Sequence, residues 1–177
     1  MSIVVGCANK NNVKVVPSTI FQGDTRLLGL HMDIISGCVE VKYNGDKKTI
    51  VVDYEIWEDG KLKDSENAIS YQIKNGKFNG EVSISLKKNN DKSMEMNTVI
   101  SEDKEYSGAG KQIEGFTDEY AHASRELEKT IKVTDNDKII IWGLSANKEG
   151  KIRFGSDDIQ SYIKSENWGL LLKLHFE

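Results

Sequence analysis

Three histidines are the residues on which general acid–base or nucleophilic catalysis would most depend. His175 falls on an outward position of a predicted C-terminal strand, beside Lys173 and Glu177, and His122 lies in a polar stretch. Both histidines therefore favour solvated surface positions. His31 and Asp33 would share a face if residues 24–35 formed a strand, and such a pairing orients an imidazole. Nothing in the spacing of the three histidines favours a small hydrolase, so the sequence leans against an enzyme.

Motifs for other chemistries are incomplete. Residues 143–147 lack the final glycine of the Gly-x-Ser-x-Gly serine motif. Asp135 and Asp137 have the spacing of calcium-loop ligands, but neither the glycine nor the closing glutamate follows, so we interpret them as a turn. The run Gly108-Ala109-Gly110-Lys111 lacks a full phosphate-binding spacing and is predicted to be a loop, as is the acidic run 102–105. The sequence predicts no metal and no cofactor.

Trp57 is the residue that most suggests ligand binding. Alternation over residues 49–57 places it on the polar face of its strand together with Asp53 and Glu55. An aromatic ring beside carboxylates on an exposed sheet can stack on sugars or contact a partner protein. We predict a ligand-binding site at these three residues, with the alternative that a loop or the other sheet covers Trp57. Trp142 and Trp168 neighbour apolar residues and are predicted to lie in the core.

The elements that would position these residues are mostly strands. Apolar and polar residues alternate with a period of two, which is typical of antiparallel sheets that bury one face, in residues 49–57, 78–86, 93–100 and 170–177. Asn-Gly and Asp-Gly dipeptides suit hairpin turns and occur at 44–45, 59–60, 75–76 and 79–80, the last of which can instead mark a bulge. Further strands are predicted at 39–43, 68–74, 127–133 and 138–144. Eight to ten strands are enough for two packed sheets.

Helix is scarce in this pattern. Ser156 is a candidate cap for a short helix through Lys164, and Thr117 for another to about Ser124, whereas residues 24–35 fit either a helix or a strand. Consecutive hairpins with few crossover helices argue against a parallel α/β sheet. We therefore predict an all-β fold, an antiparallel β-sandwich with one or two short helices. The pattern resembles an immunoglobulin-like sandwich in architecture, without the Cys–Trp–Cys spacing of antibody domains.

Composition narrows the function classes. The chain has 177 residues, of which 38% are hydrophobic and 29% charged, values that suit one folded domain. Its formal charge is −4 and no basic patch is visible, so nucleic acid is not an expected partner. No apolar run approaches the 18 residues or so that a membrane-spanning helix needs.

The first residues carry a distinct signal at Val4-Val5-Gly6-Cys7. This run resembles the lipobox of bacterial lipoproteins, and the resemblance implies cleavage before Cys7 and a diacylglycerol on its thiol. Few apolar residues and no lysine or arginine precede Gly6, so we expect the leader to be truncated. The alternative is an ordinary first strand, Ile3–Cys7, with a buried cysteine.

The resemblance also implies an organisation. Residues 1–14 are predicted to be a truncated signal with a polar tether, and residues 15–177 a single sandwich domain. A diacylglyceryl group holds a protein stably on a membrane, here the extracytoplasmic face of the cell membrane. Cys38 is then unpaired, whereas a secreted form without lipid would permit a Cys7–Cys38 disulfide.

Three hypotheses about function follow from the sequence. The first is a non-catalytic, lipid-anchored extracytoplasmic domain that binds a protein or a polysaccharide at the cell surface. The second is a small extracellular hydrolase that uses one of the three histidines. The third is a soluble inhibitor or assembly module whose sheet edge recruits a strand of its partner.

Overall fold

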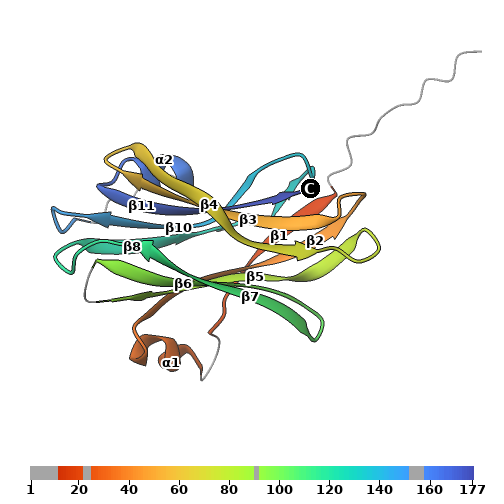
Figure 1. Cartoon of the computed structure of the whole chain (residues 1–177), viewed down its shortest axis with the longest axis horizontal. Helices are drawn as coiled ribbons and strands as arrows, with labels where there is room; N and C mark the ends of the chain where they lie inside the picture. Colours follow the sequence, from red (N-terminus) through yellow and green to blue (C-terminus); the bar gives the residue numbers. More distant parts are fainter. Residues whose placement is uncertain (1–11, 22–24, 90–91, 152–157) are drawn as a thin grey trace, which may run out of the picture.

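Two antiparallel sheets pack face to face, which confirms the predicted all-β sandwich (Figure 1). The computed structural model describes residues 12–21, 25–89, 92–151 and 158–177. Within these residues the chain forms eleven strands and two short helices. The sheets enclose one apolar core, as expected for a single domain of this length.

The larger sheet, which we call sheet A, has six strands in the order β7-β6-β5-β2-β1-β9. All its pairs are antiparallel, and its strands are β1 (Val13–Ser18), β2 (Ile34–Asn44), β5 (Lys77–Lys88), β6 (Ser93–Glu102), β7 (Glu105–Glu114) and β9 (Ile131–Val133). Because β1 begins at Val13, the first two residues of this sheet lie before the predicted domain start at residue 15.

The second sheet, sheet B, has five strands in the order β4-β3-β11-β10-β8. Its strands are β3 (Thr49–Glu58), β4 (Lys61–Gln72), β8 (Ala121–Glu126), β10 (Ile139–Asn147) and β11 (Trp168–Phe176). The C-terminal strand β11 lies in the middle of this sheet, between β3 and β10. A strand that is central and flanked on both sides holds its side chains in fixed positions, which matters for the site described below.

The period-two alternation of the sequence sets which side chains enter the core. On β3 the buried set includes Ile50, Val52, Tyr54 and Ile56, each at most 2% exposed. The intervening side chains of β3, except the nearly buried Val51, are only partly covered. The core also contains the fully buried Trp142 and Trp168, as predicted.

Two glycines mark close approaches inside the sandwich. Gly37 lies against Trp142, where a Cβ would come within 2.1 Å of the indole. Gly80 was expected to mark a bulge or a turn, but the pairing of β5 is regular on both sides of it. A Cβ on Gly80 would meet the Ser101 carbonyl oxygen at 2.0 Å, so close backbone contact explains this glycine.

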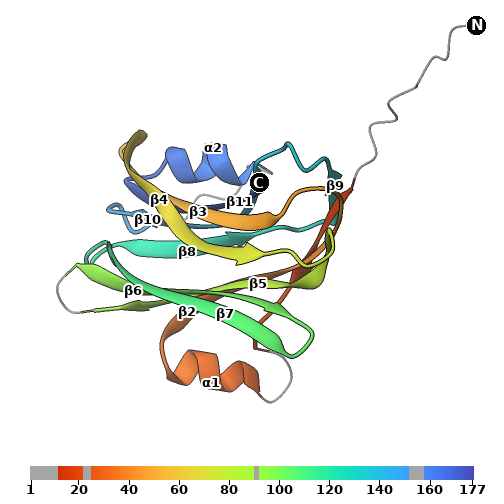
Figure 2. The ribbon, with the colours of Figure 1, turned by 45° about the vertical axis from the view of Figure 1, so that its right-hand side comes forward.

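Each helix covers part of one outer face (Figures 1 and 2). Helix α2 (Ile159–Lys164) lies on sheet B, where Tyr162 and Ile163 pack on Leu171. Its cap is Asp158, which accepts from the backbone N–H groups of the second and third helical residues, rather than the predicted Ser156, which lies outside the described residues. Helix α1 (Arg26–His31) lies on the outer side of sheet A. Neither of these helices is long and apolar enough to cross a membrane.

Two local predictions are wrong, and one alternative that the sequence left open is decided. The helix predicted from Thr117 is a turn followed by β8, because pairing with β10 outweighs weak helix propensity there. The predicted loop at 108–111 lies inside β7, where Gly108 and Gly110 pair with Val99 and Asn97. Residues 24–35 fitted either a helix or a strand, and in the described part the chain forms α1 (Arg26–His31) and a turn before β2 begins at Ile34, so His31 and Asp33 do not share a strand face.

The two cysteines differ in what the structure says of them. Cys7 and the rest of the lipobox-like run lie outside the described residues. Cys38 is a buried thiol on β2, 7% exposed, between Ser18 and Ser83 of the neighbouring strands. Burial raises the pKa of this thiol to about 11, so near neutral pH it is protonated and a poor nucleophile.

Candidate functional site

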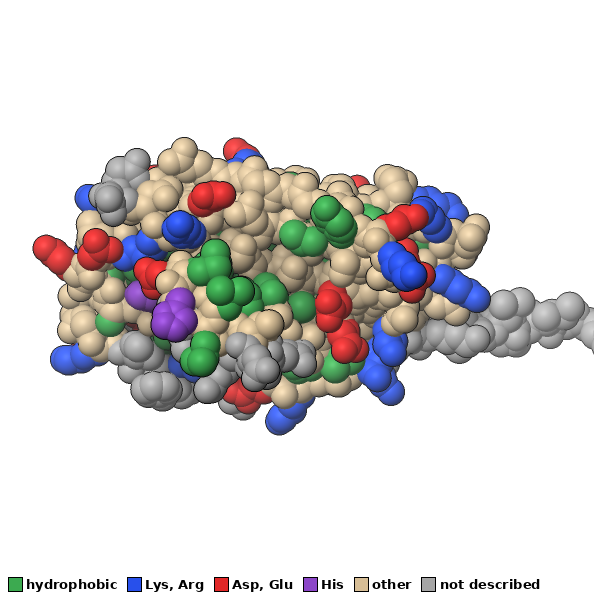
Figure 3. Space-filling view, turned by 90° about the horizontal axis from the view of Figure 1, so that it is seen from below, with side chains coloured by type: hydrophobic (Ala, Val, Ile, Leu, Met, Phe, Trp, Pro, Cys, Tyr) green, Lys and Arg blue, Asp and Glu red, His purple; other side chains and the backbone are tan. Residues whose placement is uncertain are grey.

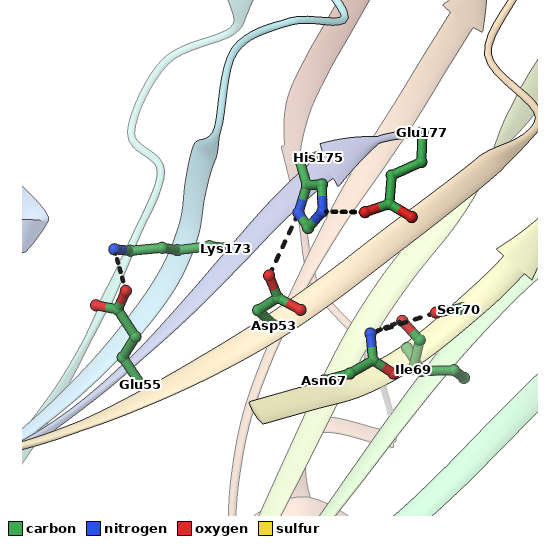
Figure 4. Close-up of polar contacts among 8 residues, drawn as sticks. All are labelled: Asp53, Glu55, Asn67, Ile69, Ser70, Lys173, His175 and Glu177. Carbon is green, nitrogen blue, oxygen red and sulfur yellow. Dashed lines mark hydrogen bonds and ion pairs between the residues drawn. The ribbon is translucent and has the colours of Figure 1, made fainter. Parts of the chain in front are cut away.

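The outer face of sheet B carries a group of charged side chains beside the part that α2 covers (Figure 4). We call it the charged cluster, and it consists of Asp53, Glu55, Lys173, His175 and Glu177. The first two come from β3 and the others from β11 and the residue after it, so strand pairing assembles the cluster. Asp53 and Glu55 belong to the site predicted from sequence.

The register of β3 and β11 explains the contacts within the charged cluster. Asp53 is directly opposite Lys173, and His175 is directly opposite Val51. The charged side chains meet along the diagonals instead, Lys173 with Glu55 and His175 with Asp53. Diagonal neighbours on one sheet face are within reach of long side chains.

Glu55 links the charged cluster to the aromatic part of the predicted site. Its Oε1 accepts from Lys173 Nζ at 2.5 Å, and its Oε2 accepts from the Trp57 indole N–H at 2.9 Å. The Glu55 and Lys173 side chains are 14% and 17% exposed. Both oxygens of Glu55 are therefore occupied, which fixes the carboxylate in one orientation.

His175 lies between two carboxylates. Its Nδ1 is 3.4 Å from Asp53 Oδ2, and its Nε2 is 3.3 Å from Glu177 Oε1. The ring is mostly covered, which corrects the expectation of a solvated histidine.

Amide and hydroxyl groups extend this polar surface onto the edge strand. Asn67 of β4 pairs with Asp53 after a register shift in β3–β4 pairing. The Asn67 side-chain amide donates to Ser70 Oγ at 3.3 Å and to the Ile69 carbonyl oxygen at 3.4 Å (Figure 4). The polar surface thus spans three strands, from β4 across β3 to β11.

The charged cluster has an excess of negative charge. Three carboxylates face one ammonium group, so the five side chains carry a formal charge of −2 when His175 is neutral and −1 when it is protonated. Rigid strands hold these groups, so a partner would meet a preorganised pattern of acceptors. Such a surface is complementary to a ligand that presents basic groups.

Trp57 is placed as predicted on the same face, and its ring is partly buried. It packs with the α2 cluster of Tyr162, Ile163 and Leu171. Lys164 Nζ lies 3.9 Å from the ring centroid, a cation–π contact. The ring is therefore engaged by α2. Of the two acidic members of the predicted trio, the Asp53 side chain is 23% exposed and the Glu55 side chain 14%.

The histidines show no catalytic geometry within the described residues. The ring nitrogens of His175 contact carboxylates, whereas a nucleophilic triad needs a hydroxyl or thiol on one of them. His122 lies 5.3 Å from the Phe116 ring, and His31 is exposed at the end of α1. No group of three or more histidine, cysteine, aspartate or glutamate side chains in the described part of the chain is arranged to hold a metal ion.

Sequence reasoning missed the β11 half of the charged cluster. It placed Lys173, His175 and Glu177 together on outward positions of the last strand, which is correct. What it lacked was the neighbour of that strand, because alternation gives the face of each strand but not the order of strands in a sheet. Comparisons with protein-family models, with curated proteins and with solved structures find no significant match to this chain.

Proposed function

We propose that this protein is a non-catalytic binding domain, held by a lipid on Cys7 at the extracytoplasmic face of a bacterial cell membrane. We further propose that it binds a protein partner through the charged cluster. The observation that carries the binding proposal is the excess of carboxylates over cations on the outer face of sheet B, where Asp53 and Glu177 contact His175 and Glu55 is paired with Lys173. The lipobox-like run at residues 4–7 supports the anchor.

The chemistry of the face favours a protein over a polysaccharide. Sugars are bound by stacking on an accessible aromatic ring, and the Trp57 ring is engaged by α2 and Lys164. A protein segment with lysine or arginine would find carboxylate acceptors at fixed positions. The proposed partner therefore presents a basic surface.

Two of the edge strands are poorly suited to pairing with a strand of a partner, which favours the outer face of sheet B as the binding site. The edge strands β4 and β7 belong to different sheets and are joined by ion pairs, Lys63 with Glu114 at 3.0 Å and Lys111 with Glu66. The pairing of β4 is also interrupted by two register shifts. Lysines and bulges on edge strands discourage the addition of another strand. An assembly module that acts through the edge at β4 or β7 is accordingly less well supported.

Photo-cross-linking in the native host tests the binding proposal. A benzophenone amino acid at Asn67, which is exposed beside Asp53, should give an adduct with a specific protein. The same group at Asn136, in the exposed turn between β9 and β10, is the control and should not give that adduct.

A charge variant makes the test specific to the charged cluster. Asp53→Asn should strongly reduce the Asn67 adduct, whereas Asp46→Asn, an equal charge change in the exposed loop after β2, should leave it intact. An adduct that is insensitive to Asp53→Asn would place the partner elsewhere on the protein and overturn the proposal.

A further inference from the structure

Helix α1 exposes two of its leucines to solvent, and large apolar residues on either side of the helix are exposed as well. Leu27, Leu28 and Met32 are 55%, 53% and 49% exposed, and the preceding Ile20 is 39% exposed. We call these four residues the apolar patch. Figure 3 views this side of the molecule and shows apolar side chains grouped near the middle of the face. A grouped set of exposed large apolar residues on a small domain is a feature of interaction surfaces.

The way α1 is seated explains this orientation. Gly29 is buried, and a Cβ there would come within 2.8 Å of the Phe21 ring. The helix thus approaches the domain at this glycine, and Leu27 and Leu28 lie on the outside. A six-residue helix with a central glycine and no acidic residue in its first turn has little stability of its own.

A row of three lysines lies on the same outer face. Lys14 of β1 is directly opposite Lys42 of β2 and Lys132 of β9. Their neighbours Val13, Val15, Val41 and Tyr43 are buried in the core, so the lysines alternate to the outer side of sheet A. None of the three makes an ion pair with another residue of the described ranges.

Like charges at directly opposed positions of a sheet repel one another, so the lysine row is unfavourable by itself. Glu40 and Glu81, the paired residues in the next outward row, lie on the side of the lysines toward α1 and offset part of this charge. The three lysines themselves lie at the end of the face where β1 begins, beyond these glutamates. An anionic surface that contacts this end of the face would reduce the repulsion between the lysines. Tyr106 of β7, 79% exposed on the same face, adds a ring suited to the headgroup layer of a bilayer.

The segment between Cys7 and β1 is long enough for a lipid on Cys7 to enter a bilayer that lies against the outer face of sheet A. Six residue steps separate Cys7 from Val13, and an extended chain covers roughly 20 Å in that distance. A plane that touches the outside of α1 lies roughly 15 Å from sheet A, the sum of a packing distance near 10 Å and a helix radius near 5 Å. An acylated Cys7 would therefore reach a bilayer on which α1 rests.

From these observations we infer that the outer face of sheet A docks on a bilayer containing anionic lipids, with the apolar patch in the interface and the lysine row on the headgroups. The inference rests on the proposed lipid anchor, which brings this face close to the membrane. Docking of this kind adds a second attachment to the acyl chains.

Cross-linking to lipid tests the inference on the acylated full chain. The protein is reconstituted in phosphatidylcholine vesicles with or without phosphatidylglycerol, and a benzophenone amino acid is placed at Leu28 or, as the control, at Leu62. Leu62 is a 51% exposed leucine on β4 of the other sheet. We expect several-fold more phospholipid adduct at Leu28 than at Leu62, and more with phosphatidylglycerol present.

Charge variants test the lysine row. Lys14→Gln with Lys42→Gln should remove the gain from phosphatidylglycerol, whereas Lys61→Gln with Lys148→Gln, two exposed lysines at the far end of sheet B, should retain it. Equal lipid adducts at Leu28 and Leu62, or an adduct of Leu28 with a second copy of the protein, would overturn the inference. Palmitate labelling of the same samples reports the anchor separately, so loss of docking with intact label refutes docking alone.

Discussion

Glu55 connects the two parts of the outer face of sheet B, the charged cluster and the part covered by α2. It accepts one hydrogen bond from Lys173 and one from the Trp57 indole, and so connects the charged cluster with α2. Trp57 therefore stabilises the fold in two ways, by packing against α2 and by donating its indole N–H to Glu55. Because the Trp57 ring is engaged in these contacts, Trp57 is a poor candidate for stacking on a ligand.

Trp57→Ala should lower the free energy of unfolding by about 2 kcal/mol, because it removes a partly buried ring from the α2 cluster. Trp57→Phe should cost about 1 kcal/mol, since most packing remains and the hydrogen bond to Glu55 is lost. Urea unfolding monitored by circular dichroism measures both. A Trp57→Ala protein as stable as the wild type would show that the ring is not held by α2.

The buried thiol of Cys38 leads to a prediction about reactivity. With a pKa near 11 and 7% exposure, Cys38 should react with an aromatic disulfide reagent at pH 8 far more slowly in the native protein than in urea. The Cys7→Ala variant makes Cys38 the only thiol and serves for the measurement. Labelling of the native protein at the rate of the unfolded chain would contradict the buried position.

At the scale of elements, α2 depends on its cap. Asp158 accepts from the backbone N–H groups of Gln160 and Ser161 and from the Ser161 hydroxyl. The hydrogen bond from the Ser161 side chain is the main cause that lowers the pKa of Asp158. A cap that binds as a carboxylate stabilises the helix in a manner that depends on pH.

Asp158→Ala should cost about 1 kcal/mol of stability at pH 7. Because the pKa is lower in the folded protein than in the unfolded chain, the ionised cap stabilises the fold above the unfolded pKa. This contribution is lost as the pH falls through the folded pKa, so the variant and the wild type should converge in acid. Thermal melts across this range measure the effect, and Asp158→Asn, which keeps a capping group without a charge, should show a smaller pH dependence. A difference that stays constant in acid would contradict the role of the carboxylate.

A buried polar pair joins the last residue of β10 to the segment between α2 and β11. Asn147 and Glu166 are 6% and 3% exposed, and the Asn147 amide donates to Glu166 Oε2. Asn147→Ala would leave a buried carboxylate without this donor, and we expect a loss of about 2 kcal/mol in chemical unfolding. Asn136→Ala in an exposed turn is the control and should be nearly neutral. If both substitutions changed the free energy of unfolding equally little, the Asn147–Glu166 hydrogen bond would not contribute to stability.

At the scale of the whole molecule, the two outer faces have different characters. Sheet B presents fixed carboxylates, and sheet A presents an apolar helix and a lysine row. Since the sheets pack face to face, these surfaces point in opposite directions (Figure 2). A domain whose sheet A faces a bilayer would therefore direct the charged cluster away from it, toward a partner.

The sequence predicted the sandwich and the faces of its strands, because burial of alternate residues is a local property of each strand. It placed Asp53, Glu55 and Trp57 on one face for this reason. It did not predict β7 or β8, whose glycines and small residues form strands only through pairing with β6 and β10. The contact of His175 with Asp53 depends on the central place of β11, which is set by the packing of the whole core.

In the function proposed above, Cys7 carries the lipid that holds this domain at the membrane. The decisive measurement is intact mass analysis of the protein isolated from the membranes of its native host. The predicted result is a chain that begins at Cys7 and is heavier than residues 7–177 by a diacylglyceryl group, with any further acyl chain added to that mass. A chain that retains residues 1–6 with an unmodified Cys7 would contradict it.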